Sequence, residues 1–379
     1  MAGIYIHIPF CKQACHYCDF HFSTQLKKKD EMLWALQEEL RLRANEFRDT
    51  TVSTIYFGGG TPSVLSASEI EQLIQTVYSH YKVEESPEIT LEANPDDLSP
   101  QKSTELAASP VNRLSIGVQS FFEEDLKLMN RAHSKKQAKD SLKQASQLFS
   151  NISIDLIYGI PYLDDAKWET NIKTALSYGI SHISSYALTV EPRTALKTFI
   201  EKGIIPDVDD AQAESQFQHL VSRLEQEGFL HYELSNFGKP GFFSKNNSAY
   251  WQGKSYLGIG PSAHSFSGTQ RSWNIANNTK YIQAIKTGEL PQEVETLSQR
   301  DRYNEYVMTG LRTMWGVSLT RVSEEFGTHF KDYLLQQAER HIAARFLFLD
   351  GDTLLVTKQG KFLSDGLAAD LFMLPLKKK

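Results

Sequence analysis

Residues 11–18 read Cys-Lys-Gln-Ala-Cys-His-Tyr-Cys, and they contain all three cysteines of the 379-residue chain, Cys11, Cys15 and Cys18. An odd number of cysteines packed so closely does not form a disulfide framework and is typical of a reducing compartment. Three thiolates at this spacing can bind three irons of a 4Fe-4S cluster and leave the fourth iron open. Zinc held by these cysteines with His16 or His21 is the alternative, although zinc loops usually take paired ligands from two chain segments.

Around this stretch, short apolar runs alternate with amphipathic segments over residues 1–190. The predicted strands lie at 4–8, 54–57, 88–92, 113–118, 152–158 and 182–188, roughly one per β/α unit. A helix predicted over 31–48 places apolar side chains on one face, namely Leu33, Leu36, Leu40, Ala44 and Phe47. Six such units predict an α/β fold with a parallel sheet, either open or curled into a partial barrel.

Beyond residue 190 the alternation ends. A helix is predicted over 212–226 and a strand over 232–237, followed by an aromatic and Gly-rich stretch from 246 to 261. Residues 302–314 and 331–344 read as helices, and 346–349 and 354–356 flank Asp350-Gly351-Asp352 as a hairpin. We therefore predict three segments: a core over 1–230, a barrel-completing or connecting segment over 231–294, and a winged-helix-like domain over 295–379.

The charge balance and the apolar runs of the sequence limit the classes of partner and the location that we expect for the protein. The chain has 40 Lys+Arg against 46 Asp+Glu, a net charge of -6, and residues 295–379 hold 12 Lys+Arg against 11 Asp+Glu. Nucleic-acid binding needs clustered basic residues, so we expect no nucleic-acid partner. No apolar run reaches the ~18 residues of a membrane span, and residues 1–10 lack the features of a secretory signal. We expect a cytoplasmic protein.

The cysteine motif, with Tyr17 directly before its last Cys, resembles the radical S-adenosylmethionine (SAM) superfamily, whose open iron is chelated by SAM. Five further motifs resemble the branch that contains anaerobic coproporphyrinogen III dehydrogenase and the haem chaperone HemW: Tyr-Ile-His-Ile-Pro-Phe-Cys (5–11), Phe-Gly-Gly-Gly-Thr-Pro (57–62), Gly-Val-Gln-Ser-Phe (117–121), Asn-Arg-Ala-His (130–133) and Ile-Asp-Leu-Ile-Tyr-Gly-Ile-Pro (154–161). The resemblance covers nearly the whole chain. It implies a three-quarter β/α TIM-like barrel with a C-terminal winged-helix-like domain, a 4Fe-4S cluster on Cys11, Cys15 and Cys18, and bound SAM.

The resemblance also implies a set of SAM contacts, carried over residue by residue: Tyr5, Tyr17, Gly59, Gly60, Thr61, Glu92, Gln119, Arg131, Asp155 and Ala187. Glycine amides can approach a carboxylate closely, and buried carboxylates can accept hydrogen bonds from an ammonium group or ribose hydroxyls. Taken singly, the Gly triplet could be a turn and each carboxylate a solvated side chain. Together they fall near the C-terminal ends of successive predicted strands, which form the ligand-binding face of a β/α barrel.

Two features distinguish an enzyme from a carrier within this branch. The oxidase members have a further Cys two residues after the third ligand, where this chain has Phe20, and an extension ahead of the Tyr, where this sequence has four residues. Both differences favour a HemW-type protein that binds haem as cargo and delivers it to an acceptor haemoprotein. Radical oxidation of coproporphyrinogen III is the alternative. The sequence leaves the electron donor unknown, and a homodimer is compatible with it.

The haem ligand is the point at which the sequence departs from its relatives. HemW proteins share a His-Asn-x-x-Tyr-Trp motif whose His is implicated in holding haem, but residues 246–251 read Asn-Asn-Ser-Ala-Tyr-Trp. An amide is a poor ligand for haem iron, so that role does not transfer to Asn246. Tyr250 and Trp251 either wall a porphyrin or pack in the core. His264 is the nearby candidate ligand, and a structural role beside the SAM site is its alternative.

Overall fold

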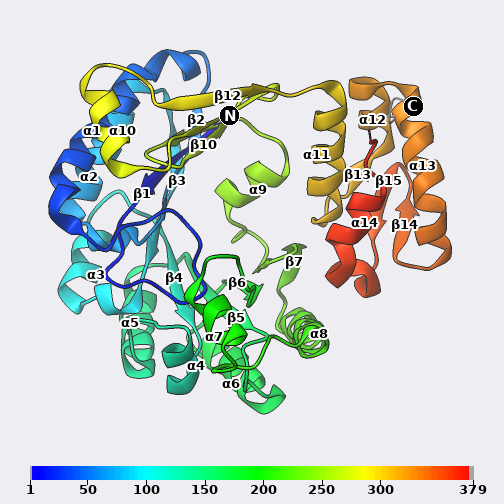
Figure 1. Ribbon diagram of the computed structural model, residues 1–379, viewed down its shortest axis with the longest axis horizontal. Coiled ribbons are helices and arrows are strands. Elements are labelled where there is room, and N and C mark those ends of the chain that lie inside the picture. The colour runs from blue at the N-terminus through cyan, green and yellow to red at the C-terminus, as the bar shows by residue number, and fades with distance from the viewer. Residues whose placement is uncertain (1, 375–379) are drawn as a thin grey trace.

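A computed structural model describes residues 2–374 (Figure 1). Six parallel strands in chain order form the centre of a 12-stranded sheet: β1 (Ala2–Ile8), β2 (Val52–Gly59), β3 (Val83–Ala93), β4 (Arg113–Gln119), β5 (Ile152–Tyr158) and β6 (His182–Ala187). Buried apolar residues recur at every second position, such as Ile4, Ile6 and Ile8 in β1, whereas residues between apolar positions, such as His7 in β1 and Asp155 in β5, line the cavities inside the curved sheet. These elements confirm the six predicted strands, with bounds that differ by a few residues at most except at the start of β3.

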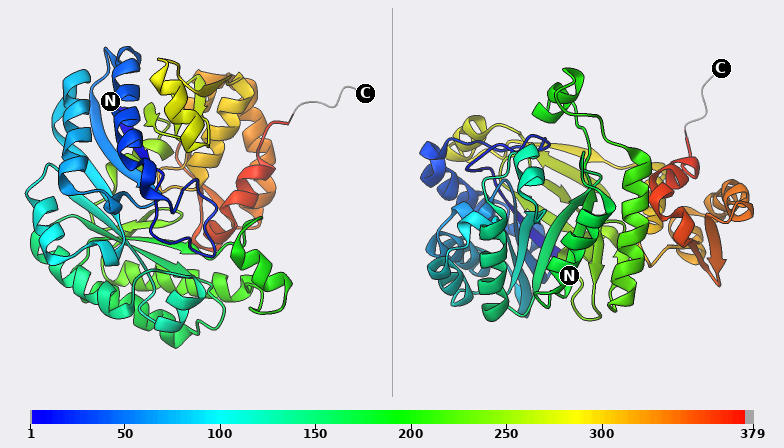
Figure 2. Two further views of the ribbon diagram at one scale, coloured as in Figure 1. Left: turned by 60° about the vertical axis from the view of Figure 1, so that its left-hand side comes forward. Right: turned by 90° about the horizontal axis from the view of Figure 1, so that it is seen from below.

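Helices connect these strands along the outside of the curved sheet (Figures 1 and 2). Along the outside lie α1 (Lys29–Leu42), α2 (Ala67–His80), α3 (Pro100–Ala107), α5 (Lys135–Leu148), α6 (Asp165–Leu176) and α8 (Asp210–Gln226), the last of which follows β6. α4 (Glu123–Leu128) and α7 (Ala195–Glu201) lie instead against the loop of residues 11–18, where the His16 amide donates to the Met129 carbonyl at 3.0 Å and the Leu196 amide donates to the His16 carbonyl at 2.8 Å. Short 3-10 turns lie at Leu26–Lys28, Ala44–Phe47, Pro62–Val64, Pro95–Asp97 and Lys358–Leu363. The helix predicted over 31–48 is wrong at its end, because Arg43 leaves the helical conformation and its buried side chain contacts the carbonyl of Gly258.

Further strands extend both edges of the sheet. β9 (Tyr256–Ile259) pairs in parallel with β1, and β10 (His264–Phe266), β11 (Gln270–Asn274) and β12 (Gln292–Thr296) follow it. Beyond β6 lie β8 (Asn236–Gly238) and β7 (Leu230–Glu233), an antiparallel pair. The predicted single strand over 232–237 is therefore wrong, because the chain turns back at residues 234–235, where the Glu233 carboxylate accepts from the Ser235 amide. The order from β12 to β7 leaves the barrel open, as the partial-barrel prediction requires.

Two helices follow β8. α9 (Lys245–Trp251) is a short helix that the aromatic and Gly-rich pattern did not predict, and the Ser244 hydroxyl caps its first turn. α10 (Asn278–Lys286) packs against α1 on the outside of the sheet. α9 lies inside the curve of the sheet in Figure 1, near the C-terminal helices.

A second hydrophobic core lies in the C-terminal part of the chain. Its elements are α11 (Gln299–Leu311), β13 (Val317–Ser318), α12 (Leu319–Phe326), α13 (Thr328–Ala343), β14 (Leu347–Asp350), β15 (Thr353–Val356) and α14 (Ser364–Asp370). The order of helix, strand, two helices and hairpin is the winged-helix arrangement that was predicted. The helix predicted over 302–314 ends at Leu311, because Met314 N–H instead donates to the Tyr232 carbonyl at 3.0 Å.

Residues 375–379 of the segment predicted over 295–379 lie outside the described residues. None of the helices within residues 2–374 combines the length and apolar character that crossing a bilayer requires.

Candidate cluster site and adjoining cavity

The cysteine loop follows β1 and lies over the C-terminal ends of the next strands. It encloses a cavity of about 160 Å³, here called the cysteine cavity. Eleven of the thirteen predicted site residues line it: Cys11, Cys15, Cys18, Tyr17, Gly59, Gly60, Thr61, Glu92, Gln119, Arg131 and Asp155. Tyr5 instead lines the adjoining larger cavity, and Ala187 is half-buried at the end of β6 and lines neither. The fold thus brings residues of β2, β3, β4 and β5 together with the cysteine loop and with Arg131, which follows α4.

Asn130 and Arg131 hold the cysteine loop in position. Asn130, at a φ of 55°, donates to the Ala14 carbonyl at 2.7 Å and accepts from the Gln13 amide at 2.8 Å. The Arg131 guanidinium donates to the Gly117 carbonyl at 2.8 Å and to Asn94 Oδ1 at 2.7 Å. These contacts explain why the Asn-Arg pair follows α4, since it ties the loop to the ends of β3 and β4.

Gly59 and Gly60 are required by close packing as well as by any ligand. Gly59 has a φ of 104°, and a Cβ there would lie 2.4 Å from His7 Nδ1. At Gly60 a Cβ would lie 2.6 Å from the Phe10 carbonyl oxygen, which belongs to the start of the cysteine loop. Residues with a side chain would therefore push the loop away from the sheet.

The surroundings of the three thiols combine burial, which disfavours the free thiolate, with two hydrogen bonds to sulfur, which favour it. Burial raises the pKa of Cys11 and of Cys18 to about 11 in the absence of a metal. Arg131 Nη1 donates to Cys15 Sγ at 3.3 Å, and Thr61 Oγ1 donates to Cys11 Sγ at 3.4 Å, and both contacts stabilise thiolates. Within residues 2–374 no three His, Cys, Asp or Glu side chains are arranged to hold one metal ion. A 4Fe-4S cluster makes a different demand, because each thiolate binds its own iron.

Two carboxyl groups lie at the inner wall of the cysteine cavity. Burial raises the pKa of Glu92 to about 7 and that of Asp155 above its usual range. Tyr56 Oη donates to Glu92 at 2.8 Å, and Ser115 Oγ donates to Asp155 at 3.2 Å. Neither carboxylate forms an ion pair with any described residue. A positively charged ligand would therefore find uncompensated acceptors here.

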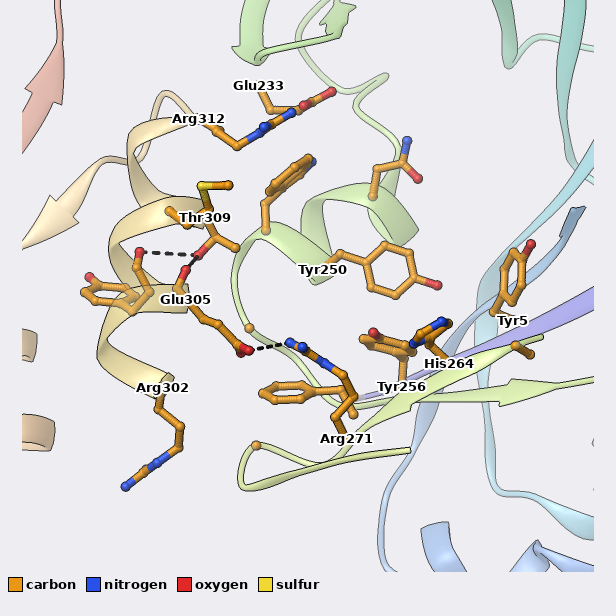
Figure 3. A pocket seen from close by; sticks show the side chains of 18 of the residues that line it. Tyr5, Glu233, Tyr250, Tyr256, His264, Arg271, Arg302, Glu305, Thr309 and Arg312 are labelled. Atoms are coloured by element: carbon orange, nitrogen blue, oxygen red, sulfur yellow. Dashed lines mark hydrogen bonds and ion pairs between the residues drawn. The ribbon is translucent and has the colours of Figure 1, made fainter. Parts of the chain in front are cut away.

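A larger cavity of about 1180 Å³ adjoins the cysteine cavity and extends to the C-terminal helices. Figure 3 shows α11 with Arg302, Glu305, Thr309 and Arg312 on one side, and Tyr5, Tyr256 and His264 on the other. Its wall is rich in aromatic side chains, which are Tyr5, Phe20, Tyr186, Tyr250, Trp251, Tyr256, Phe266, Tyr306 and Phe326. Four arginines also line it, namely Arg271, Arg302, Arg312 and Arg321. Phe20, Gly59 and Glu92 belong to both cavities.

Asn246 and its neighbours on α9 have different surroundings. The Asn246 side chain is buried, accepts from Thr54 Oγ1 at 3.0 Å, and does not line the large cavity. Tyr250 and Trp251 do line it, as one of the two expectations for them required. His264 begins β10 and faces the same cavity.

The sequence did not indicate several residues of the two cavities. Asn94, which binds Arg131, comes two residues after Glu92 and had no motif of its own. Of the arginines that line the large cavity, Arg271 lies on β11, Arg302 on α11, Arg312 directly after α11 and Arg321 on α12. Only the helical spacing of Arg302, Glu305, Thr309 and Arg312 could have indicated any of them.

The two parts of the chain match two known families. Residues 5–175 match the radical SAM superfamily, and residues 297–363 match the HemN C-terminal domain. The protein "Heme chaperone HemW" of Bacillus subtilis is 35% identical over 370 residues, which are 96% of this chain and 97% of that protein. The protein of the same name from Mycobacterium tuberculosis is 32% identical, over 97% of this chain and 94% of that one.

A solved structure shares the fold over nearly the full length. It is the coproporphyrinogen III oxidase (HemN) of Escherichia coli, described as a radical SAM enzyme, with a TM-score of 0.85 and 24% identity over 98% of this chain and 90% of that chain. The likeness in fold agrees with the open β/α barrel and the C-terminal domain described above. With full-length relatives at more than 30% identity, the chain belongs to the HemW family of the radical SAM superfamily.

Proposed function

We propose that this protein carries haem to an acceptor haemoprotein and holds a SAM-ligated 4Fe-4S cluster beside its cargo. The observation that carries the proposal is the large cavity next to the cysteine cavity. Its volume of about 1180 Å³ exceeds the roughly 300–1,000 Å³ of ordinary ligand pockets. Aromatic rings offer a flat apolar wall, and arginines offer partners for carboxylates. A porphyrin with propionate side chains has this chemistry, and the name "Heme chaperone" of the relatives agrees with it.

The residues of the cysteine cavity would hold the cofactors. Cys11, Cys15 and Cys18 would each bind one iron. The predicted SAM contacts that line this cavity would surround SAM: Tyr17, Gly59, Gly60, Thr61, Glu92, Gln119, Arg131 and Asp155. Tyr5, which lines the adjoining large cavity, and Ala187, at the end of β6, would contact SAM from outside it. When bound, the cluster supplies single electrons and an open iron for SAM. Arg131 would keep the loop and its thiolates in place, and Glu92 and Asp155 would face the positive charge of SAM.

Phe20 supports a carrier over an oxidase. Its side chain is 68% exposed and lines both cavities, where the oxidase branch has a further Cys. A phenyl ring offers no sulfur for ligation or redox chemistry, but it offers an apolar contact to a flat macrocycle. We therefore infer that this position contributes to holding the cargo.

Two parallel assays on the anaerobically reconstituted protein test the proposal. We expect haem uptake and transfer to an apo-haemoprotein, and no decarboxylation of coproporphyrinogen III. Tyr250→Ala, in the cavity wall, should reduce haem uptake, whereas Tyr78→Ala, an exposed aromatic on α2, should not. Decarboxylation of the porphyrinogen would establish the oxidase function instead. The absence of both activities would refute the proposal.

A further inference from the structure

Three histidines line the large cavity, and they differ in which ring nitrogens are free. His7 Nε2 lies 2.9 Å from the His21 carbonyl, so it carries the proton, and His7 Nδ1 accepts from Tyr5 Oη at 3.3 Å. His21 Nε2 lies 2.7 Å from Asn278 Oδ1. His264 has no hydrogen bond to either ring nitrogen among the described residues. Among the described residues, His21 Nδ1 also has no hydrogen-bond partner, but His264 is the one of the three whose two ring nitrogens are both without one.

The His264 ring is also in the chemical form that binds iron. Its side chain is exposed toward the cavity, and partial desolvation together with the positive charge of Arg271 lowers its pKa, so that the imidazole is neutral at physiological pH. A neutral imidazole has the lone pair that a metal requires. Its ring centroid lies 6.1 Å from that of Trp273 on the next strand.

The backbone on both sides of His264 is held by buried hydrogen bonds. The Ser265 hydroxyl accepts from the Gly258 amide at 2.9 Å and from Arg43 Nη2 at 3.2 Å. The Ala263 carbonyl accepts from the Asn274 amide at 2.9 Å. These contacts fix the segment that carries the ring before any ligand arrives, as a binding site requires.

One arginine of the cavity lacks a carboxylate partner. Ion pairs join Arg271 to Glu305, Arg312 to Asp365 and Arg321 to Glu325. Arg302, on α11, forms no ion pair with any described residue. Its Nε is buried without a hydrogen-bond partner, and its guanidinium lies 5.9 Å from the centre of the Phe326 ring. Among the four arginines that line the cavity, Arg302 can therefore bind a carboxylate without breaking an existing ion pair.

We propose that His264 is the axial ligand of the haem iron and that Arg302 binds a haem propionate. This inference rests on the proposed carrier function and names the side chains that hold the cargo. It is also compatible with the absence of a His at position 246, because Asn246 is buried on α9 against Thr54 of β2 and does not line the cavity. His264 stands on the strand side of the cavity and Arg302 on the helix side (Figure 3).

Titration with ferric haem and with iron-free protoporphyrin IX separates the two roles. His264→Ala should shift the Soret band and weaken ferric haem binding at least tenfold, but leave protoporphyrin IX binding unchanged, because only the iron contact is lost. Added imidazole should restore the wild-type Soret band. Arg302→Gln should weaken both porphyrins about tenfold, because both carry propionates.

Control variants keep the result interpretable. Arg340→Gln removes an exposed arginine of α13 outside the cavity and should bind both porphyrins as the wild type does. Circular dichroism should show that every variant is folded. An unchanged Soret band and haem affinity in His264→Ala, or a loss that appears in His21→Ala instead, would overturn the ligand. Wild-type protein that binds no haem would refute the carrier function itself.

Discussion

Replacing Glu39 by Gln should destabilise the protein although the two side chains have nearly the same shape. Glu39 is fully buried on α1, and its carboxylate accepts from four donors. Oε1 accepts from Asn274 Nδ2 at 2.8 Å and Arg43 Nη1 at 3.2 Å, and Oε2 accepts from the Gly260 amide at 2.7 Å and Tyr281 Oη at 2.5 Å. A Gln side chain replaces one of these acceptors by an NH₂ donor. In either orientation the NH₂ group faces two donors.

The loss of stability depends on which of the four donors cannot reorient to accept a hydrogen bond from the Gln NH₂ group. The Tyr281 hydroxyl can rotate to accept, but the Gly260 amide and the guanidinium of Arg43 cannot. At least one buried donor is therefore left unsatisfied, and Arg43 loses one of its two carboxylates while retaining Glu46. We expect a loss of about 2–4 kcal/mol in the free energy of unfolding. Because the hydrogen bonds of Glu39 and Arg43 also hold Gly258, Gly260 and Asn274, haem affinity should fall together with the free energy of unfolding.

Denaturant unfolding followed by circular dichroism measures this loss, and α1 provides the control. Glu38→Gln, one residue earlier, removes a partly exposed carboxylate that pairs with the exposed Arg41. It should change the free energy of unfolding by less than about 0.5 kcal/mol. If Glu39→Gln unfolds at the same denaturant concentration as the wild type, the reasoning about the four donors is refuted.

Three further predictions concern the cysteine loop and its neighbours. Cys15→Ala should abolish the iron-sulfur absorbance after anaerobic reconstitution, because one iron loses its thiolate, and retained colour would mean a different ligand set. Gly60→Ala should cost about 1–3 kcal/mol, since its Cβ meets the Phe10 and Ile8 carbonyls, whereas Gly366→Ala, whose Cβ meets nothing within 4 Å, should not destabilise; equal losses would contradict the packing account. Burial lowers the pKa of His7 to about 4, so the unfolded state binds the proton more tightly. Wild-type stability should therefore fall, relative to His7→Gln, by about 3 kcal/mol as the pH decreases from about 6.5 to 4, and a difference independent of pH would argue against this.

Much of the fold could be predicted because its parallel strands are buried on both faces. Such strands appear in the sequence as short runs rich in apolar and β-branched residues, and 152–158 coincides with β5 although it contains Ser153 and Asp155. The turn inside 232–237 was missed because it depends on hydrogen bonds of Glu233 to residues 235 and 236. The helix α9 was missed because it has a single buried residue, Asn246, and so shows no apolar face.

The site could be predicted only as far as its residues belong to local motifs. The cysteines and the Gly triplet are contiguous, so their chemistry is visible in the sequence. Arg302 can be recognised as a carboxylate-binding residue only from the structure, which shows that Arg271, Arg312 and Arg321 are already paired with carboxylates. Likewise, the availability of His264 depends on the contacts that occupy the other two histidines, and tertiary contacts of this kind leave no periodic pattern.

Anomalous diffraction at the iron edge, from crystals of the reconstituted and haem-loaded protein, tests the central claim most directly. The account predicts two iron positions, a cluster at Cys11, Cys15 and Cys18 and a single iron in the large cavity beside His264. A single iron found elsewhere, or a cavity without iron while haem is bound at the surface, would contradict it.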